Sequence, residues 1–480
     1  MPTCHHYHRI HPRLRGVKLG SKLPKTAARG ARAEGQFPAG TLSPAQILTA
    51  YGFKQNQFAG LTSVTKLGIG SLGGGVVQAD IDNAVAAWGM LAPKLTVRTV
   101  GGATNDPTAD TDANVENSLD IVPTMAFAYW FLTGQAADIT ICFGPNASNG
   151  MTLVTQDLVA AGVEVASWSW GSAADQWDPT ERAALAAAFQ AGVQAGVTFC
   201  AASGDNSIDD GTSSPSADYP ASDPCVWGVG GTNLQIAADG SRASESAWGD
   251  GNPGDEGGGG GFDPTVAEPP FQQGIVPSGQ GRGVPDSAAN ADPNSGWQMS
   301  ANGQWTVVGG TSAASPFTAA LIAVAKAIAK LPASAGLLTP AIYAARATAC
   351  NDITTGSNGD PAAVGWDPAT GLGSPNAAAF IAALTGATPP AQQPAPPAPA
   401  PTPAPAPPIS APAPTQPAPP PVPAPPHVSA RKACLLASQG IVQNYPTDGS
   451  TPALADVQGW ASDGLASGWP TTSATTSTKP

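Results

Sequence analysis

Apolar residues in this chain fall into short continuous runs that alternate with longer segments of helical periodicity. Short apolar runs between turn residues are typical of strands that are buried on both faces. We therefore expect strands at 64–70, 95–100, 138–143, 163–169, 196–202 and 225–229, and helices at 79–91, 114–133, 150–161, 179–193 and 312–331. A further short helix is expected where Ser43 can act as the cap and Pro44 as the first helical residue. This alternation predicts an α/β fold with a parallel sheet and helices on both of its faces.

Composition divides the chain into four segments. Residues 1–40 are basic and lack an apolar core, so we expect a basic N-terminal tail and not a Sec signal peptide. Residues 41–387 contain the predicted strands and helices and form one domain. Residues 388–427 are almost wholly proline and alanine, which predicts a polyproline-II linker of roughly 120 Å at ~3.1 Å per residue. Residues 428–480 are interpreted as a small C-terminal tail of unknown role.

Charge and cysteine content narrow the possible partners. The 480-residue chain has a net charge of −13, and only 11% of its residues are charged. The negative charge argues against nucleic acid and anionic membranes as partners. No run of about 18 apolar residues is present, so no membrane span is expected. The six cysteines include no C-x-x-C pair, which argues against a zinc site and leaves the disulfide pairing unassigned.

Ser312 lies among small residues at the start of the last predicted helix, in Gly309-Gly310-Thr311-Ser312. Unpaired N–H groups at a helix start can stabilise an oxyanion, so Ser312 is a candidate nucleophile, and the alternative is a helix-capping serine. Residues 12–426 contain no histidine, and residues 95–325 contain no lysine. Neither a Ser-His-Asp triad nor a Ser-Lys dyad is therefore expected, and the base for Ser312 would be a carboxylate.

Glu116 and Asp120 are four residues apart, on one face of a predicted helix, and Asp112 extends the same stripe. If they are buried, such carboxyls share a proton and can act as a general base at acidic pH. If they are exposed, they form an ordinary solvated acidic face. The apolar surroundings and the scarcity of charge favour the buried pair. Pro123 removes a hydrogen bond just beyond Asp120 and is a complication for this helix.

Two further segments follow predicted strands, at the sheet edge where α/β proteins collect their ligands. Asp205 follows the strand at 196–202, and Ser169-Trp170-Gly171 lies at the end of the strand at 163–169. A protonated Asp205 could donate a hydrogen bond to an oxyanion, whereas the alternative is a residue of an Asx turn.

A third cluster combines the carboxylates of Asp352 and Asp367 with a loop that contains glycines. Calcium takes about six to eight oxygen ligands from carboxylates and backbone carbonyls, so this cluster is a candidate ion site. The alternative is a turn-rich loop that binds no ion.

The order of Glu116, Asp120, Asp205 and Ser312 resembles the sedolisin family of serine-carboxyl peptidases, and its kumamolisin-like members in particular. The similarity covers roughly residues 42–385. Blocks similar to the family occur at 115–121, 167–171, 202–205, 219–222, 281–286, 309–312 and 365–368.

The resemblance implies a subtilisin-like fold and a role for each matched residue. The nucleophile would be Ser312, and its base would be Glu116. Asp120 would orient Glu116, and Asp205 would be the acid of the oxyanion hole. Ser169-Trp170-Gly171 would pair with the substrate backbone as an added strand.

The resemblance also implies one structural Ca²⁺ ion. Its ligands would be the side chains of Asp352 and Asp367 and the carbonyls of Ile353, Ala363 and Gly365. Ala363 stands where the family usually has glycine, which a carbonyl ligand does not require.

Two further departures bear on folding and proton sharing. The family is made with a long folded propeptide, whereas only a short basic tail precedes Leu42, so we expect either that folding and latency are handled differently or that the open reading frame is incomplete. Ser71 stands where kumamolisin-like enzymes carry a glutamate, so we expect less extensive proton sharing around Glu116.

These observations predict an endopeptidase that acts on polypeptides within roughly pH 3–5, since the reference pKa of its glutamate base is about 4.3. We expect a secreted, extracellular monomer. The first alternative is a catalytically silent sedolisin-like binding module that the Pro/Ala segment tethers. The second is a structural, wall-associated protein, which only that segment supports.

Overall fold

The computed structural model describes residues 37–61, 64–147, 149–212, 214–249, 256–331 and 335–386. The predictions for the basic tail as far as residue 36, for the linker at 388–427 and for the tail at 428–480 lie outside the described residues.

The helices include two short 3-10 segments, η3 and η4, and one π-helical segment, η2. They are α1 (Pro44–Ala50), α2 (Gln78–Trp88), α3 (Thr111–Leu119), η2 (Asp120–Ala126), α4 (Phe127–Thr133), α5 (Gly150–Ala160), η3 (Ala174–Gln176), α6 (Pro179–Gln194), η4 (Pro293–Ser295), α7 (Thr311–Ala329), α8 (Thr339–Ala349) and α9 (Ala377–Thr385).

The strands form one large sheet and several two-stranded pairs. They are β1 (Lys66–Ser71), β2 (Lys94–Thr99), β3 (Asp138–Phe143), β4 (Val165–Trp168), β5 (Ser172–Ala173), β6 (Thr198–Ala202), β7 (Asp218–Tyr219), β8 (Val226–Ile236), β9 (Arg242–Ala247), β10 (Gly261–Asp263), β11 (Arg282–Val284), β12 (Ser287–Asn290), β13 (Trp297–Ala301), β14 (Gln304–Val308), β15 (Cys350–Asn351) and β16 (Ser374–Pro375).

The large sheet has the strand order β12-β8-β6-β4-β1-β3-β2, with every neighbouring pair parallel. Strand β9 adds to it by pairing antiparallel with β8. All six predicted strands are present, and β3 has the predicted bounds. β8 runs further than predicted, because its second half pairs with β9. The α/β fold with a mainly parallel sheet is therefore confirmed.

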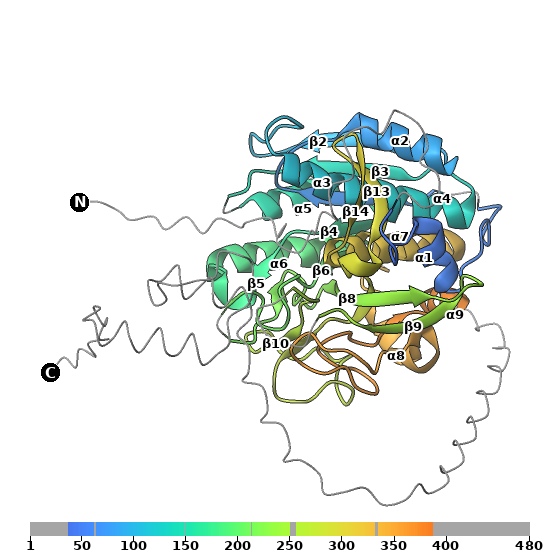
Figure 1. The fold of residues 1–480 in the computed structure, drawn as a ribbon. Helices are drawn as coiled ribbons and strands as arrows, with labels where there is room; N and C mark the ends of the chain where they lie inside the picture. Colours follow the sequence, from blue (N-terminus) through green and yellow to red (C-terminus); the bar gives the residue numbers. More distant parts are fainter. Residues whose placement is uncertain are drawn as a thin grey trace, which may run out of the picture. The chain divides into compact units, whose positions relative to one another are not determined.

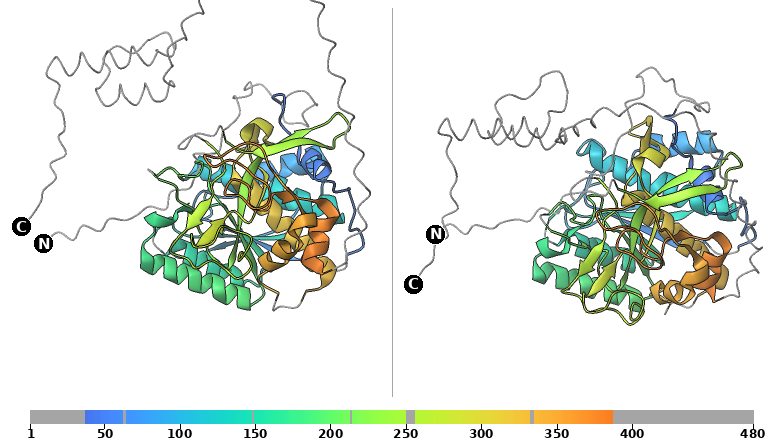
Figure 2. Two further views of the ribbon diagram at one scale, coloured as in Figure 1. Left: turned by 90° about the horizontal axis from the view of Figure 1, so that it is seen from below. Right: turned by 60° about the horizontal axis from the view of Figure 1, so that its bottom comes forward.

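Helices cover both faces of the sheet, as predicted. α7 packs against β4, β6, β8 and β12, and α4 and α9 pack against α7. α5 packs against β1 and β3, and α6 packs against β6 and α5. In both views of Figure 2, the green α6 lies well apart from the orange α9.

α7 passes through the middle of the domain (Figure 1). By length and composition it could cross a membrane, but 89% of its most apolar window is buried inside the domain. Burial on all sides accounts for its apolar sequence, because a helix that is surrounded by other elements has no polar face.

The helix predicted at 114–133 is present as the consecutive segments α3, η2 and α4. Pro123 lies inside the π-helical segment. The Thr124 hydroxyl donates to the carbonyls of Leu119 at 2.7 Å and Asp120 at 2.9 Å. Because proline has no N–H, the wider turns and this hydroxyl provide donors for carbonyls that a regular helix would leave without one. The helix thus continues past Pro123.

The hairpin β13–β14 was not predicted, although its turn carries a recognisable signal. Asn302 and Gly303 connect the two strands with φ values of 50° and 74°. Positive φ at both positions of a two-residue turn favours the dipeptide Asn-Gly. The hairpin leads directly into the Gly309-Gly310 turn that precedes α7.

Candidate functional site

The candidate residues come from three parts of the fold. Glu116 lies in α3, Asp120 begins η2, Asp205 follows β6 and Ser312 lies in the first turn of α7. All four are buried, with exposed fractions of 2% for Glu116, Asp205 and Ser312 and 0% for Asp120. Glu116 and Asp120 are therefore not a solvated acidic face.

α3 has a well-defined start. Asp110 caps it by accepting hydrogen bonds from the N–H groups of Asp112 and Ala113, both at 3.0 Å. Asp112 is exposed in the first turn, so it does not extend the buried pair. Ser71 at the end of β1 donates to the side-chain oxygen of Asn117 at 2.7 Å.

Ser169 connects the carboxyl pair to the end of β4. Its hydroxyl lies 2.7 Å from Oδ1 of Asp120 and 3.3 Å from the carbonyl oxygen of Ser312. It also lies close enough to Glu116 to lower the pKa of that carboxyl. The sequence indicated only backbone pairing for this residue, and it did not indicate the side-chain contact.

Burial determines the protonation of the pair. It raises the pKa of Glu116 to about 8, and the charge of Asp205 acts in the same direction. Hydrogen bonds from the hydroxyls of Ser312 and Ser169 lower it. Burial, followed by the charge of Glu116, raises the pKa of Asp120 well above its usual range. The two carboxyls therefore hold protons at pH values at which exposed carboxyls are ionised.

The hydrogen bonds are consistent with a proton on this pair. Within the described residues, Oε1 of Glu116 and Oδ2 of Asp120 have no hydrogen-bond partner. A proton on either carboxyl would provide a donor for one of these oxygens.

Asp205 lies against the start of α7. Its Oδ1 atom accepts a hydrogen bond from the Thr311 N–H at 2.7 Å and one from the Thr311 hydroxyl at 2.8 Å. Gly310 has a φ of 113°, and a Cβ atom there would lie 2.9 Å from Oδ2 of Asp205. Glycine is therefore needed at this position, both for its backbone conformation and for the close approach of the carboxyl.

Lysine and histidine, the alternative bases for a serine nucleophile, do not serve Ser312. Lys326 Nζ donates to the carbonyl oxygens of Glu164 at 2.8 Å and Gly196 at 2.7 Å. No histidine occurs in the part of the chain that the structure describes. A carboxyl thus remains the base that the surroundings of Ser312 offer.

The backbone after Ser169 turns into the short strand β5. Trp170 is 2% exposed, and a Cβ atom on Gly171 would lie 2.2 Å from Oδ1 of Asp218, so both positions are tightly packed. β5 pairs antiparallel with β7.

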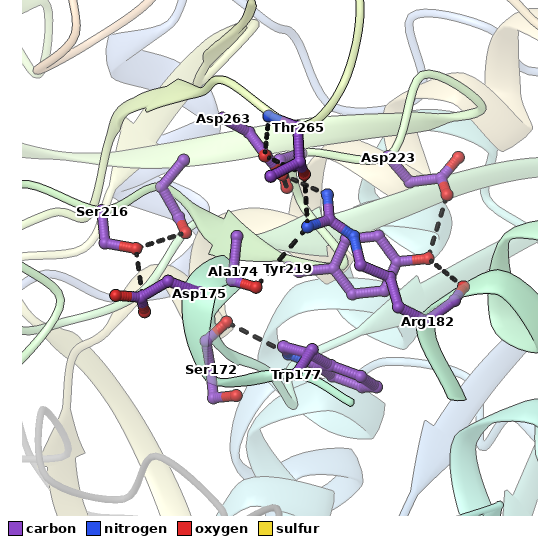
Figure 3. Close-up of polar contacts among 12 residues, drawn as sticks. Ser172, Ala174, Asp175, Trp177, Arg182, Ser216, Tyr219, Asp223, Asp263 and Thr265 are labelled. Carbon is purple, nitrogen blue, oxygen red and sulfur yellow. Dashed lines mark hydrogen bonds and ion pairs between the residues drawn. The ribbon is translucent and has the colours of Figure 1, made fainter. Parts of the chain in front are cut away.

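A polar cluster from α6 and neighbouring loops holds this strand pair (Figure 3). The guanidinium of Arg182 forms an ion pair with Asp263, and its carbon lies 4.5 Å from the ring centre of Tyr219 in β7. Trp177 packs edge-on against Tyr219 at 5.0 Å between ring centres and donates to the Ser172 carbonyl at 3.3 Å. These contacts fix the backbone that follows Ser169-Trp170-Gly171.

The candidate calcium loop brings its two carboxylates close to backbone N–H groups. Asp352 accepts from the Gly365 N–H at 3.1 Å, and Asp367 accepts from the Ala363 N–H at 3.1 Å. Ile353 is buried beside Asp352. The described residues contain no group of three or more His, Cys, Asp or Glu side chains that could hold a metal. Two carboxylates give fewer oxygens than calcium takes, so an ion here would also need backbone carbonyls as ligands.

Comparison with known proteins identifies the family. The sequence model of the subtilase family matches residues 103–366. Kumamolisin from Bacillus sp. (strain MN-32) is 35% identical over 384 residues, which cover 74% of this chain and 66% of kumamolisin. This chain belongs to the sedolisin family. Its kumamolisin-like character, which the sequence blocks indicated, is confirmed.

Other members of the family agree. Sedolisin from Pseudomonas sp. (strain 101) is 29% identical over 393 residues, which cover 76% of this chain and 63% of sedolisin. A solved structure of Pseudomonas sedolisin, a serine-carboxyl proteinase in complex with pseudo-iodotyrostatin, superposes with a TM-score of 0.62 and 24% identity. That superposition covers 72% of this chain and 98% of the sedolisin chain, and it shows the shared fold. The chain spans about two thirds of the length of kumamolisin and sedolisin.

The raised pKa of Glu116 predicts how stability depends on pH. The folded protein keeps a proton that the unfolded chain releases, so the free energy of unfolding should fall as pH rises from 4.5 to about 8. Glu116→Gln removes this titration and should flatten the fall, which melting temperatures across that range would measure.

Asp157→Asn is the matched control. Arg98 lowers the pKa of Asp157, so its stabilising effect is lost only as pH falls into the acid range. This variant should keep the wild-type slope between pH 4.5 and about 8. A Glu116→Gln profile parallel to that of the wild type would contradict the assignment of a buried, protonated Glu116.

Proposed function

We propose that this protein is an acid-acting serine-carboxyl endopeptidase that hydrolyses peptide bonds in polypeptides. The observation that carries the proposal is the Ser312 hydroxyl beside the buried carboxyl of Glu116, whose pKa it lowers, in a chain of the sedolisin family. Extracellular location and a monomeric state belong to the same proposal.

Each carboxyl has a separate task in the proposed reaction. Ser312 Oγ attacks the scissile carbonyl while Glu116 accepts the hydroxyl proton, and Asp120 orients Glu116. The tetrahedral intermediate collapses to an acyl-enzyme when Glu116 returns the proton to the leaving amine. Water, deprotonated by Glu116, then attacks the acyl carbonyl, and Glu116 returns the proton to Ser312 Oγ as the second product leaves.

The oxyanion is stabilised at the start of α7. The Ser312 N–H and a protonated Asp205 would donate to it, and Asp205 is held next to this position by the N–H and hydroxyl of Thr311. The substrate backbone would pair with Ser169-Trp170-Gly171 as an added strand. The Arg182 cluster in Figure 3 supports this role, because it fixes the strand pair that follows these three residues.

Two opposite requirements set the pH range. Glu116 works as a base only when it is ionised, and Asp205 works as a donor only when it is protonated. The raised pKa of Glu116 shifts the range upward from the roughly pH 3–5 that an ordinary glutamate pKa gives, whereas the need for a protonated Asp205 holds it on the acid side of neutrality.

The alternative, a catalytically silent binding module, has less support. A silent relative is expected to have lost at least one catalytic group, whereas Ser312, Glu116, Asp120 and Asp205 are all present and buried around one site.

The first prediction of the proposed function distinguishes the enzyme from the silent module. Purified protein should cleave a denatured protein substrate at about pH 4, and Ser312→Ala should abolish the cleavage because it removes the nucleophile. Ser315→Ala is the control, since Ser315 is also buried in α7 but bonds to Ser167 at 2.9 Å. Cleavage that survives in Ser312→Ala, or an optimum at or above about pH 7, would contradict the proposed chemistry.

The second prediction concerns Asp205. Asp205→Ala removes one oxyanion donor and should lower kcat by about 10²–10³. Asp205→Asn can donate through its amide at any pH, so it should retain more activity and lose less of it as the pH rises towards about 6. Full pH–rate profiles of both variants measure this difference. A folded Asp205→Ala that cleaves at the wild-type rate would leave Asp205 as a turn residue only.

We also propose one structural Ca²⁺ ion in the loop at 352–367. The carboxylates of Asp352 and Asp367 and the carbonyls of Ile353, Ala363 and Gly365 would hold it. Bound calcium would supply a positive charge that neutralises the two carboxylates and ties the loop together.

The third prediction tests this ion. Metal analysis at about pH 5–6 should find one calcium per chain, and chelation should lower the melting temperature, since calcium at 100 times its Kd adds about 2.7 kcal/mol. Asp352→Asn should remove the chelator effect, whereas Asp360→Asn in the same loop should keep it. A protein that stays metal-free in calcium would reduce the loop to an ordinary turn.

A further inference from the structure

Asp80 is a buried carboxylate that the proposed reaction does not use. It lies in the first turn of α2 and has an exposed fraction of 0%. Four neutral donors surround it: the hydroxyls of Ser118 and Ser300, both at 2.7 Å, and the backbone N–H groups of Asn302 at 2.9 Å and Gly303 at 2.7 Å.

These donors come from α3, which carries Glu116, and from the hairpin β13–β14, which precedes the turn before Ser312. Ser118 lies in α3, between Glu116 and Asp120 in the sequence. The other three donors lie in the hairpin β13–β14 and its turn. The carboxylate of Asp80 therefore accepts hydrogen bonds from both α3 and the hairpin and links the two elements.

Asn302 provides a second link between the hairpin and α3. Its side-chain amide donates to the Thr111 carbonyl at 2.9 Å, and its side-chain oxygen accepts from Asn114 at 3.0 Å. The tip of the hairpin is therefore fastened to the first two turns of α3, in addition to the Asp80 bond further along the helix.

The hydrogen bonds of Asp80 lie close in the chain to both Glu116 and Ser312. At about 100° per residue, Ser118 is about 200° around the helix from Glu116, so Asp80 holds the side of α3 opposite the carboxyl pair. Beyond the hairpin, β14 ends at Val308, and Gly309 and Gly310 lead into Ser312. One carboxylate thus holds the helix of the base and, through β13 and the turn, the hairpin whose second strand leads to the nucleophile.

We infer that Asp80 is a positioning residue that sets the distance between Ser312 and Glu116, an inference that rests on the proposed function. The position requires a carboxylate, because only two acceptor oxygens with about four lone-pair sites can satisfy four donors. In Asp80→Asn, the NH₂ group would face two of the four donors and could not accept a hydrogen bond from them. A shift of about 1 Å between reacting groups can cost about 10²-fold in rate.

The test compares Asp80→Asn with Glu245→Gln. Glu245 is also buried and accepts from the hydroxyls of Tyr51 at 2.8 Å, Thr232 at 2.6 Å and Ser374 at 2.6 Å, but none of these lies in α3 or the hairpin. Both variants should lower the melting temperature. Well below that temperature, Asp80→Asn should lower kcat about tenfold or more with little change in KM, and Glu245→Gln should leave kcat unchanged.

Amide hydrogen exchange gives a readout that does not depend on activity. Asp80→Asn should speed exchange in residues 111–121 and 297–308, and Glu245→Gln should not. Ser118→Ala removes only one of the four bonds, so it serves as the test if Asp80→Asn does not fold.

The outcomes separate this inference from the proposed function. A wild-type kcat together with unchanged exchange in residues 111–121 of Asp80→Asn would overturn the positioning role. Absence of Ser312-dependent cleavage in the wild type would overturn the proposed function, and the exchange data would still show whether Asp80 couples the helix to the hairpin.

Discussion

The burial of several carboxyls around one serine is the constraint on which the rest of this structure depends. Glu116, Asp120 and Asp205 are each at most 2% exposed. An ionised carboxylate that leaves water loses several kcal/mol of hydration unless protons or hydrogen-bond donors compensate. Burial is the largest cause of the pKa shifts of Glu116 and Asp120, and the causes of both shifts include no cation.

Neutral donors stabilise these groups without forcing them to ionise. A lysine or arginine beside the pair would lower both pKa values and fix the carboxylates in the charged form. Burial raises the pKa of Glu116 more than the neighbouring hydroxyls of Ser312 and Ser169 lower it, so a proton stays available near the nucleophile. Elsewhere the chain does bury a cation, as in the Arg282–Asp286 pair at 2.6 Å.

The sequence predicted the features that depend on local pattern. Continuous apolar runs located all six core strands, and the spacing of Glu116 and Asp120 placed both on one face of a helix. The sequence could not show contacts between residues far apart in the chain, such as Ser169 with Asp120 or Asp80 with the hairpin. These contacts depend on side-chain directions that only the assembled sheet defines. The sequence indicated Pro123 as a complication of this helix, but it did not predict the π-helical turns that accommodate the proline.

Ser71 shows how one substitution changes the extent of the carboxyl network. The sequence resemblance matches Ser71 to a position at which kumamolisin-like enzymes carry a glutamate. Here the Ser71 hydroxyl donates to Asn117, the neighbour of Glu116, at 2.7 Å. Asn117 in turn donates to the Gly73 carbonyl at 3.1 Å, so these contacts tie the end of β1 to α3 and involve no third carboxyl. Fewer carboxyls near Glu116 mean less like-charge repulsion, so the high pKa of the pair depends mainly on burial. The packing that keeps water from α3 therefore controls the basicity of Glu116, and the hairpin held by Asp80 and Asn302 is part of that packing.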